Sequence, residues 1–259
     1  MNGQAELLEF AKNAVRSAAA GFFAHDHEYL GQITGTELGG KETKLVADAV
    51  LENALRSSFL RTGLSVLTEE SGFIKQDSGN DLCWVIDPLD GSVNYLRRSG
   101  PSAISVALCS DGQPLLGILY SLDTRTLSWG GQEIGAWSEG RPIHVSTTKR
   151  LEEGLICAGI PARFKTDNQD TVNAYFALIT RFSKVRMLGS AAISLLLVAQ
   201  GGADAYFEDQ IMLWDVAAGL AIVTGAGGVF YLRKTGLQGP CWVLASNSKL
   251  NITDSSYGI

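Results

Sequence analysis

One stretch of the sequence organises the rest, WVIDPLDGSVNY at residues 84–95. Its first three residues form an apolar run that is typical of a buried strand. Pro88 cannot donate to a sheet ladder and biases the residue before it toward an extended backbone. We therefore expect the strand to stop at Pro88, with Asp87 and Asp90 lying together at its end.

Gly91 and Ser92 follow the second carboxylate. Gly91 permits a tight turn, and Ser92 is a suitable cap for the short segment that runs to Gly100. Paired carboxylates suit a hard cation such as Mg²⁺, and the free N–H groups beyond them suit a phosphate. The alternative is a plain D-P-x-D-G turn, in which both Asp side chains only bond local backbone donors.

The composition indicates a globular chain with a sizeable core. Of the 259 residues, 46% are hydrophobic and 19% are charged. This length fits one large domain or two packed halves. The net charge of −6 and the pI near 5.1 argue against a general nucleic-acid binder.

Four cysteines are widely scattered and none forms a CxxC pair, so we expect buried thiols rather than disulfides or zinc ligands. The N-terminal residues lack the pattern of a signal peptide, and no apolar run reaches transmembrane length. We therefore expect a cytoplasmic protein that has no membrane partner.

Apolar periodicity divides the chain into short elements. Two strand-like runs at 103–109 and 115–121, separated by Asp-Gly-Gln-Pro, predict a hairpin. Residues 25–40 are polar and Gly-rich, which favours a mobile loop. About 1–148 mix helices with consecutive strands, and 149–259 alternate strand with helix. The sequence thus predicts a layered α/β protein of two packed halves, with ligands where the halves meet.

Further acidic residues lie at element boundaries. Glu69 and Glu70 follow a short strand candidate, Asp48 lies on a helix, and Asp215 begins an apolar helix. Each also has an ordinary interpretation. The Glu pair can be a solvated loop, Asp48 a surface residue, and Asp215 a helix N-terminal residue that interacts with the dipole.

Five motifs occur in a fixed order: TEESG, WVIDPLDGSVNY, LGSAA, GGADAYFE and LWDVAAGLAIVTGAGG. From about residue 40 to 246, the chain resembles the inositol monophosphatase family. These are Mg²⁺-dependent, lithium-sensitive phosphomonoesterases, in a superfamily that includes fructose-1,6-bisphosphatases and 3′-nucleotidases. The resemblance implies a five-layer αβαβα sandwich, a homodimer and a small phosphate ester as substrate.

The resemblance also implies the metal ligands. Glu69 matches the metal-binding glutamate of the family, and Glu70 matches it less well. Asp87 would bridge two Mg²⁺ ions, with the Leu89 carbonyl oxygen completing the first site. Asp90 and Asp215 would hold the second ion, and a third, weaker ion would rest on Glu69 and waters.

The remaining roles implied by the resemblance concern water and phosphate. In the family a threonine hydroxyl, paired with an aspartate, orients the attacking water, and the matching residues here are Ser92 and Asp48. The backbone N–H groups of Gly91 and Ser92 would hold the phosphate.

Substrate hydroxyls would contact a different part of the chain. Ser190 and Ala191 match residues that line the polyol pocket of the family, and Glu208 matches a glutamate that binds a ring hydroxyl. Asp90 and Asp215 would contact substrate as well as metal. The alternative for Glu208 is a charge at a strand end.

Three departures from the family pattern stand out. Leu45 occupies the position of a threonine in D-x-V-T-x-x-D, which affects the outer shell of the third metal and the water-orienting network. Gly225 occupies the position of a glutamate, and we expect this change to alter helix-end packing rather than metal binding. The loop 28–40, which precedes Lys41, is unlike the family consensus, so substrate preference stays open.

Three functions compete at this point. The first is a Mg²⁺-dependent phosphatase of a polyol phosphate such as inositol monophosphate. The second is a related phosphatase that acts on 3′-phosphoadenosine 5′-phosphate, fructose 1,6-bisphosphate or histidinol phosphate. The third is a phosphatase-like scaffold that works through a partner surface. A second phosphate on the substrate would need extra cations, and the candidates are Arg97, Arg98, Arg163 and Lys165.

Overall fold

The computed structural model describes residues 2–37, 42–77, 79–164 and 167–253. Its helices are α1 (Asn2–Phe23), α2 (His27–Leu30), α3 (Val46–Phe59), α4 (Ser92–Arg97), α5 (Gln169–Ile179), α6 (Ala191–Ala199) and α7 (Leu213–Gly225). Its strands are β1 (Ile33–Glu37), β2 (Glu42–Leu45), β3 (Ser65–Thr68), β4 (Gly72–Ile74), β5 (Leu82–Asp90), β6 (Ala103–Ser110), β7 (Gln113–Ser121), β8 (Thr126–Gly131), β9 (Gly135–Ser138), β10 (Arg141–Pro142), β11 (Leu155–Ala158), β12 (Lys184–Arg186), β13 (Ala205–Ile211), β14 (Val229–Lys234) and β15 (Cys241–Ser246).

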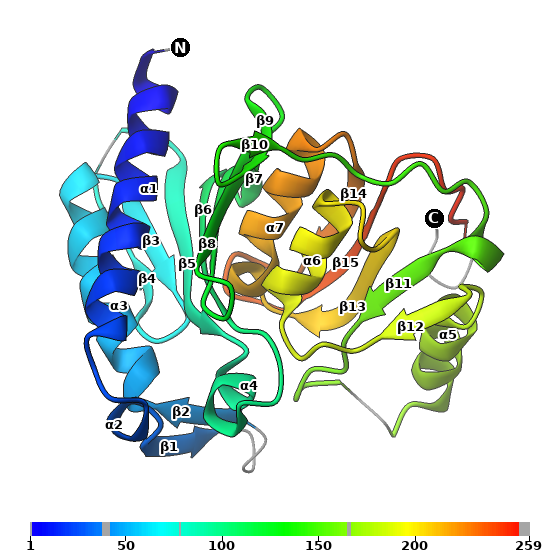
Figure 1. Cartoon of the computed structure of the whole chain (residues 1–259), viewed down its shortest axis with the longest axis horizontal. Coiled ribbons are helices and arrows are strands. Elements are labelled where there is room, and N and C mark those ends of the chain that lie inside the picture. The colour runs from blue at the N-terminus through cyan, green and yellow to red at the C-terminus, as the bar shows by residue number, and fades with distance from the viewer. Residues whose placement is uncertain (1, 38–41, 78, 165–166, 254–259) are drawn as a thin grey trace.

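Five layers follow one another across the molecule (Figure 1). Helices α1 and α3 cover the outer face of an eight-stranded sheet, whose order is β10-β9-β8-β7-β6-β5-β3-β4. Helices α6 and α7 lie between this sheet and a five-stranded sheet of order β12-β11-β13-β15-β14, and α5 covers the far side. The expected αβαβα sandwich is confirmed.

The two middle helices show why the layers form. Every residue of α6 except Leu197 is buried, and α7 is buried over most of its length. A helix that is apolar all round must be covered on all sides, and here the two sheets cover it. By contrast, α1 buries one stripe, Ala11, Val15, Ala18 and Phe22, which packs on the first sheet.

The register of β5 prepares the site. Strand β3 runs parallel to β5, with Thr68 opposite Ile86. The next residue along each chain segment, Glu69 just after β3 and Asp87 on β5, therefore lies beside the other. The backbone N–H of Glu69 donates to the Ile86 carbonyl oxygen over 3.2 Å, which extends the pairing to the edge.

Two sequence predictions about the strands are wrong. Strand β5 does not stop at Pro88 but continues to Asp90, and its pairing with β6 shifts register between Asp87 and Asp90. Pro88 lies in this bulge, where a strand residue needs no ladder donor. Residues 25–40 are not simply a loop, because they contain α2 and β1, and β1 pairs with β2 as an antiparallel hairpin.

All four cysteines are buried free thiols, as expected. The hairpin predicted around residues 103–121 is confirmed as β6 and β7. None of the helices in the described part of the chain combines the length and apolar character that a bilayer-spanning segment needs.

Candidate active site

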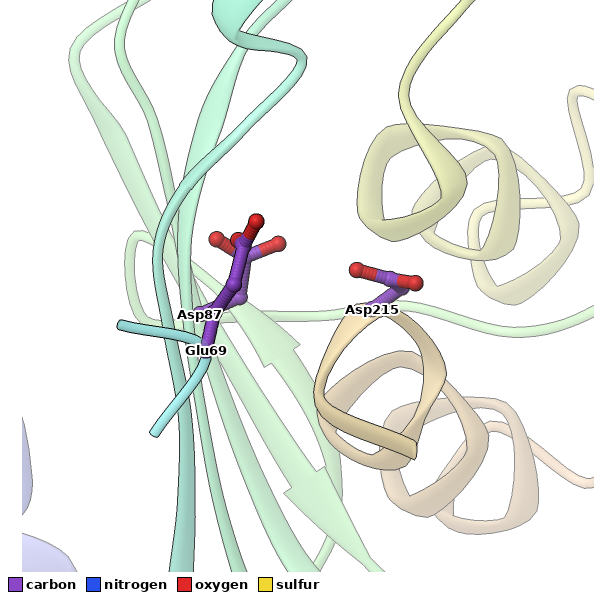
Figure 2. A group of neighbouring side chains, drawn as sticks. All are labelled: Glu69, Asp87 and Asp215. Atoms are coloured by element: carbon purple, nitrogen blue, oxygen red, sulfur yellow. The ribbon is translucent and has the colours of Figure 1, made fainter. Parts of the chain in front are cut away.

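Three carboxylates converge on the gap between the first sheet and the middle helices. Glu69 follows β3, Asp87 lies on β5, and Asp215 lies in the first turn of α7. One carboxylate oxygen from each lies within 4.8 Å of the others, and Figure 2 shows the side chains facing one another. Among the described residues, these three carboxylates form the one group of acidic, His or Cys side chains whose spacing suits a metal ion.

The negative charges of Glu69, Asp87 and Asp215 favour the binding of a cation. Burial raises the pKa of Asp87 well above its usual value, and the nearby Glu69 and Asp215 carboxylates raise it further. Burial raises the pKa of Asp215 in the same way, with added repulsion from Glu69 and Asp90. Buried carboxylates that repel one another stay ionised only when a positive charge compensates them. Their oxygens are the donors that Mg²⁺ prefers, so the residues fit such an ion.

Asp90 joins the two sides of the site. Its carboxylate accepts a short hydrogen bond from the Ser190 hydroxyl and further bonds from the backbone N–H groups of Ala191 (3.2 Å) and Ala192 (3.1 Å). These donors form the N-terminus of α6, where a negative charge is favoured. Burial raises the pKa of Asp90 to about 6, although the three hydrogen bonds act in the opposite direction. Ser190 and Ala191 thus lie at the site.

Ser92 does not cap a helix, which corrects the sequence prediction. Gly91 is the residue before α4, with φ of 83°, and a Cβ there would lie 2.8 Å from the Pro101 carbonyl oxygen. A glycine is therefore needed at this turn. The Ser92 hydroxyl instead lies 2.9 Å from Asp48 Oδ1 and 2.9 Å from the Leu89 carbonyl oxygen.

Asp48 is buried in the first turn of α3, so it is not a surface residue. Its second oxygen accepts from the Leu45 backbone N–H over 2.6 Å. Burial raises the pKa of Asp48 to about 7, against the effect of its bonds to Leu45 and Ser92. Leu45 therefore fixes Asp48 through its backbone, and this contact does not depend on which side chain the residue carries.

Glu208 lies deeper, on β13. Its side chain is buried and accepts from the Tyr206 hydroxyl over 2.7 Å. Burial raises the pKa of Glu208 to about 7. A cavity of about 250 Å³ reaches this carboxylate and is also lined by Asp90, Gly159, Ser190, Ala191, Ser194 and Asp215.

A larger cavity of about 410 Å³ opens beside the first one and shares Asp215 with it. Its wall contains Glu69, Gly91 and Ser92, together with two cationic residues, Lys44 and Arg163. Of the other cations named from the sequence, Arg97 and Arg98 are exposed and do not line this cavity. Lys41 and Lys165 lie outside the described residues.

Three neighbours of the site escaped the sequence analysis as functional residues. Lys44 Nζ lies 2.6 Å from Glu69 and 2.6 Å from Glu70. Glu52 accepts from the Thr68 hydroxyl over 2.9 Å and so fixes the strand end that carries Glu69. Tyr206 holds Glu208. A single Lys, Glu or Tyr carries no signal in a sequence, because its partners are distant in the chain.

Comparisons with known proteins identify the family. A model of the inositol monophosphatase family matches residues 4–253. An inositol-1-monophosphatase of Synechocystis sp. is 36% identical over 228 residues, which cover 86% of this chain and 77% of that protein. The protein named Nus factor SuhB of Escherichia coli is 30% identical over 227 residues, with 86% and 84% covered.

The fold is also similar to that of a solved structure from the same family. The inositol monophosphatase from Anabaena (Nostoc) sp. superposes with a TM-score of 0.79 at 31% identity, covering 96% of this chain and 93% of that one. The family match spans nearly the whole chain, and the fold and the order of the motifs agree with it. The chain therefore belongs to the inositol monophosphatase family and is a phosphoric monoester hydrolase.

Proposed function

We propose that the protein is a Mg²⁺-dependent phosphatase of a small polyol phosphate, and that inositol monophosphate is its preferred ester. The observation that carries this proposal is the convergence of Glu69, Asp87 and Asp215 from three separate elements, within 4.8 Å of one another, with Glu69 and Asp215 in the wall of a cavity. The adjoining cavity ends at a buried carboxylate, Glu208, which suits a substrate hydroxyl.

Glu69, Asp87, Asp90 and Asp215 would hold the metal, together with the carbonyl oxygen of Leu89. When bound, Mg²⁺ stabilises charge on the phosphoryl oxygens and lowers the pKa of the attacking water. The contribution of the chain is to arrange these oxygens on β3, β5 and α7 before the substrate arrives. Such preorganisation costs no rearrangement during the reaction.

Ser92 and Asp48 orient the water in this mechanism. The Ser92 hydroxyl donates to Asp48 Oδ1, so its oxygen can accept a proton of the water. Asp48 is itself held by the Leu45 N–H. The first N–H groups of α4 lack partners within the helix, and Gly91, Ser92 and Val93 line the same cavity, where the N–H groups of Gly91 and Ser92 would bind the phosphate.

Glu208 would accept a hydrogen bond from a hydroxyl of the polyol, while Tyr206 fixes its orientation. Gly159 leaves room for the Glu208 carboxylate, since a Cβ at this position would clash with its oxygens.

The direct test measures phosphate release by the purified protein, with Mg²⁺ and with EDTA. The substrates are myo-inositol 1-phosphate, fructose 1,6-bisphosphate, 3′-phosphoadenosine 5′-phosphate, histidinol phosphate and glycerol 2-phosphate. Mg²⁺-dependent release that is fastest with the inositol ester supports the proposal. Absence of release from every ester, with Mg²⁺ bound, contradicts it and favours a scaffold that acts through a partner.

Ser92→Ala is expected to lower kcat by about 100-fold, with little change in KM, because it removes the group that orients the water but not the phosphate contacts. Steady-state kinetics with the best ester measure the effect. Ser99→Ala, at an exposed serine of the same segment, is the matched control and should behave as the wild type. An unchanged kcat for Ser92→Ala would remove Ser92 from the mechanism.

A second candidate substrate class is supported by Arg163, which lines the larger cavity near Ser92. A guanidinium there suits a second phosphate, as in fructose 1,6-bisphosphate. This candidate predicts that Arg163→Met raises KM for the bisphosphate about tenfold, or about 1.4 kcal/mol, and leaves KM for the inositol ester nearly unchanged. Arg97→Met, at an exposed arginine, serves as control. An equal effect on both esters would exclude this role of Arg163.

A further inference from the structure

Lys44 lies on the hairpin that borders the acidic group. It belongs to β2, where Gly35 of β1 pairs with it, and it lines the larger cavity. Its ammonium lies 2.6 Å from Glu69 Oε1 and 2.6 Å from Glu70 Oε1. Only 15% of the Lys44 side chain is exposed, so this is a largely desolvated pair of contacts rather than a surface salt bridge.

The contact with Lys44 occupies only one carboxylate oxygen of Glu69. Lys44 binds Oε1 of Glu69, so the second oxygen can still face Asp87 and Asp215. The Lys44 ammonium lies between two carboxylates, each at 2.6 Å, and a lysine is ordinarily a cation at neutral pH.

A fixed ammonium changes the charge balance of the centre. It compensates the Glu69–Glu70 side, whereas Asp87 and Asp215, which lie within 4.8 Å of each other and of Glu69, have no cationic partner among the described residues. A lysine ammonium is a compact point charge that offers several donors, so it can satisfy two carboxylates at once, as a cation bound there would.

We propose that Lys44 is a built-in cation that takes the place of one divalent ion on the Glu69–Glu70 side of the active centre. The inference rests on the proposed function, because it takes Glu69, Asp87 and Asp215 as metal ligands. Divalent ions bind on the side of Asp87, Asp90 and Asp215, with Glu69 contributing the oxygen that Lys44 does not occupy, and Lys44 stays on the two glutamates when they do. Removal of the ammonium opens a further position for a divalent ion.

Metal counting tests the inference without reference to activity. Metal-stripped wild type, Lys44→Met and the control Lys149→Met, at an exposed lysine, are titrated with Mn²⁺. Free Mn²⁺ is measured by electron paramagnetic resonance. Lys44→Met keeps the length of the side chain and removes its charge, and we expect it to bind about one more Mn²⁺ per chain than the wild type. The control should bind the wild-type number. An equal or smaller number in Lys44→Met overturns the inference.

A second measurement uses the wild type alone and does not depend on the folding of a variant. In crystals grown with Mn²⁺, anomalous scattering locates the ions. We expect the Lys44 ammonium to remain within hydrogen-bond distance of Glu69 and Glu70. A Mn²⁺ ion between these glutamates, with Lys44 turned away, overturns the inference but leaves the proposed function intact. Absence of Mn²⁺ from the whole acidic group overturns both.

Discussion

Asp215→Asn is expected to lower kcat/KM for the best ester by about three orders of magnitude, which corresponds to about 4 kcal/mol of transition-state stabilisation. The substitution removes one negative charge from a group whose members lie within 4.8 Å of one another. A neutral amide binds a hard cation more weakly than a carboxylate does, so the ion that Asp215 would hold is lost or displaced. Phosphate release at saturating Mg²⁺ measures the effect.

The fold should survive this substitution. Asp215 Oδ2 accepts from the Met212 backbone N–H over 3.0 Å, and the amide oxygen of an asparagine can accept the same bond. Asp209→Asn is the matched control, since Asp209 lies on β13 and is outside the acidic group. Near-normal turnover in Asp215→Asn, with a circular dichroism spectrum like that of the wild type, would show that Asp215 is not a metal ligand.

Gly225→Ala is expected to lower the free energy of unfolding by about 2–3 kcal/mol and the Tm by about 5–10 °C. Gly225 ends α7, where a Cβ would lie 2.5 Å from the Gly135 carbonyl oxygen and 2.8 Å from the Gly131 nitrogen. Both are backbone atoms of the β8–β9 hairpin and cannot turn away as a flexible side chain can. Thermal unfolding followed by circular dichroism measures the change.

Gly21→Ala is the matched control. Gly21 is an exposed residue of α1, and no atom lies within 4 Å of a Cβ placed there. This change should raise stability slightly, by up to about 1 kcal/mol, because alanine favours a helix. If both variants unfold at the wild-type temperature, α7 does not pack as closely against the β8–β9 hairpin in solution as the structure has it. The same contact gives a physical reason for glycine at position 225.

Local sequence signals predicted the regular elements well where those elements are deeply buried. The runs around β6 and β7 are apolar and separated by turn residues, and the hairpin that they predict is present. The hairpin of β1 and β2 was missed for the opposite reason. It pairs only within itself, and β1 is largely exposed, so its residues need no apolar pattern.

The choice between the two glutamates shows where local reasoning stops. Glu69 and Glu70 are adjacent and chemically alike, and both contact Lys44. The parallel register of β3 and β5 is what places Glu69 beside Asp87. Strands pair through backbone hydrogen bonds. The side chains of Glu69 and Glu70 therefore do not show which of the two lies beside Asp87.

The sequence by itself determined the family, the layered α/β class and the acidic residues that converge at the site, because each of these depends on motifs within short stretches. Only the tertiary structure decided which oxygens face one another, that Lys44 lies against the Glu pair, and that Arg163 reaches the cavity. Lys44 and Glu69 are 25 residues apart, and Asp90 and Ser190 are 100 apart. Contacts over such separations are set by how the sheets and helices pack, which no local pattern records.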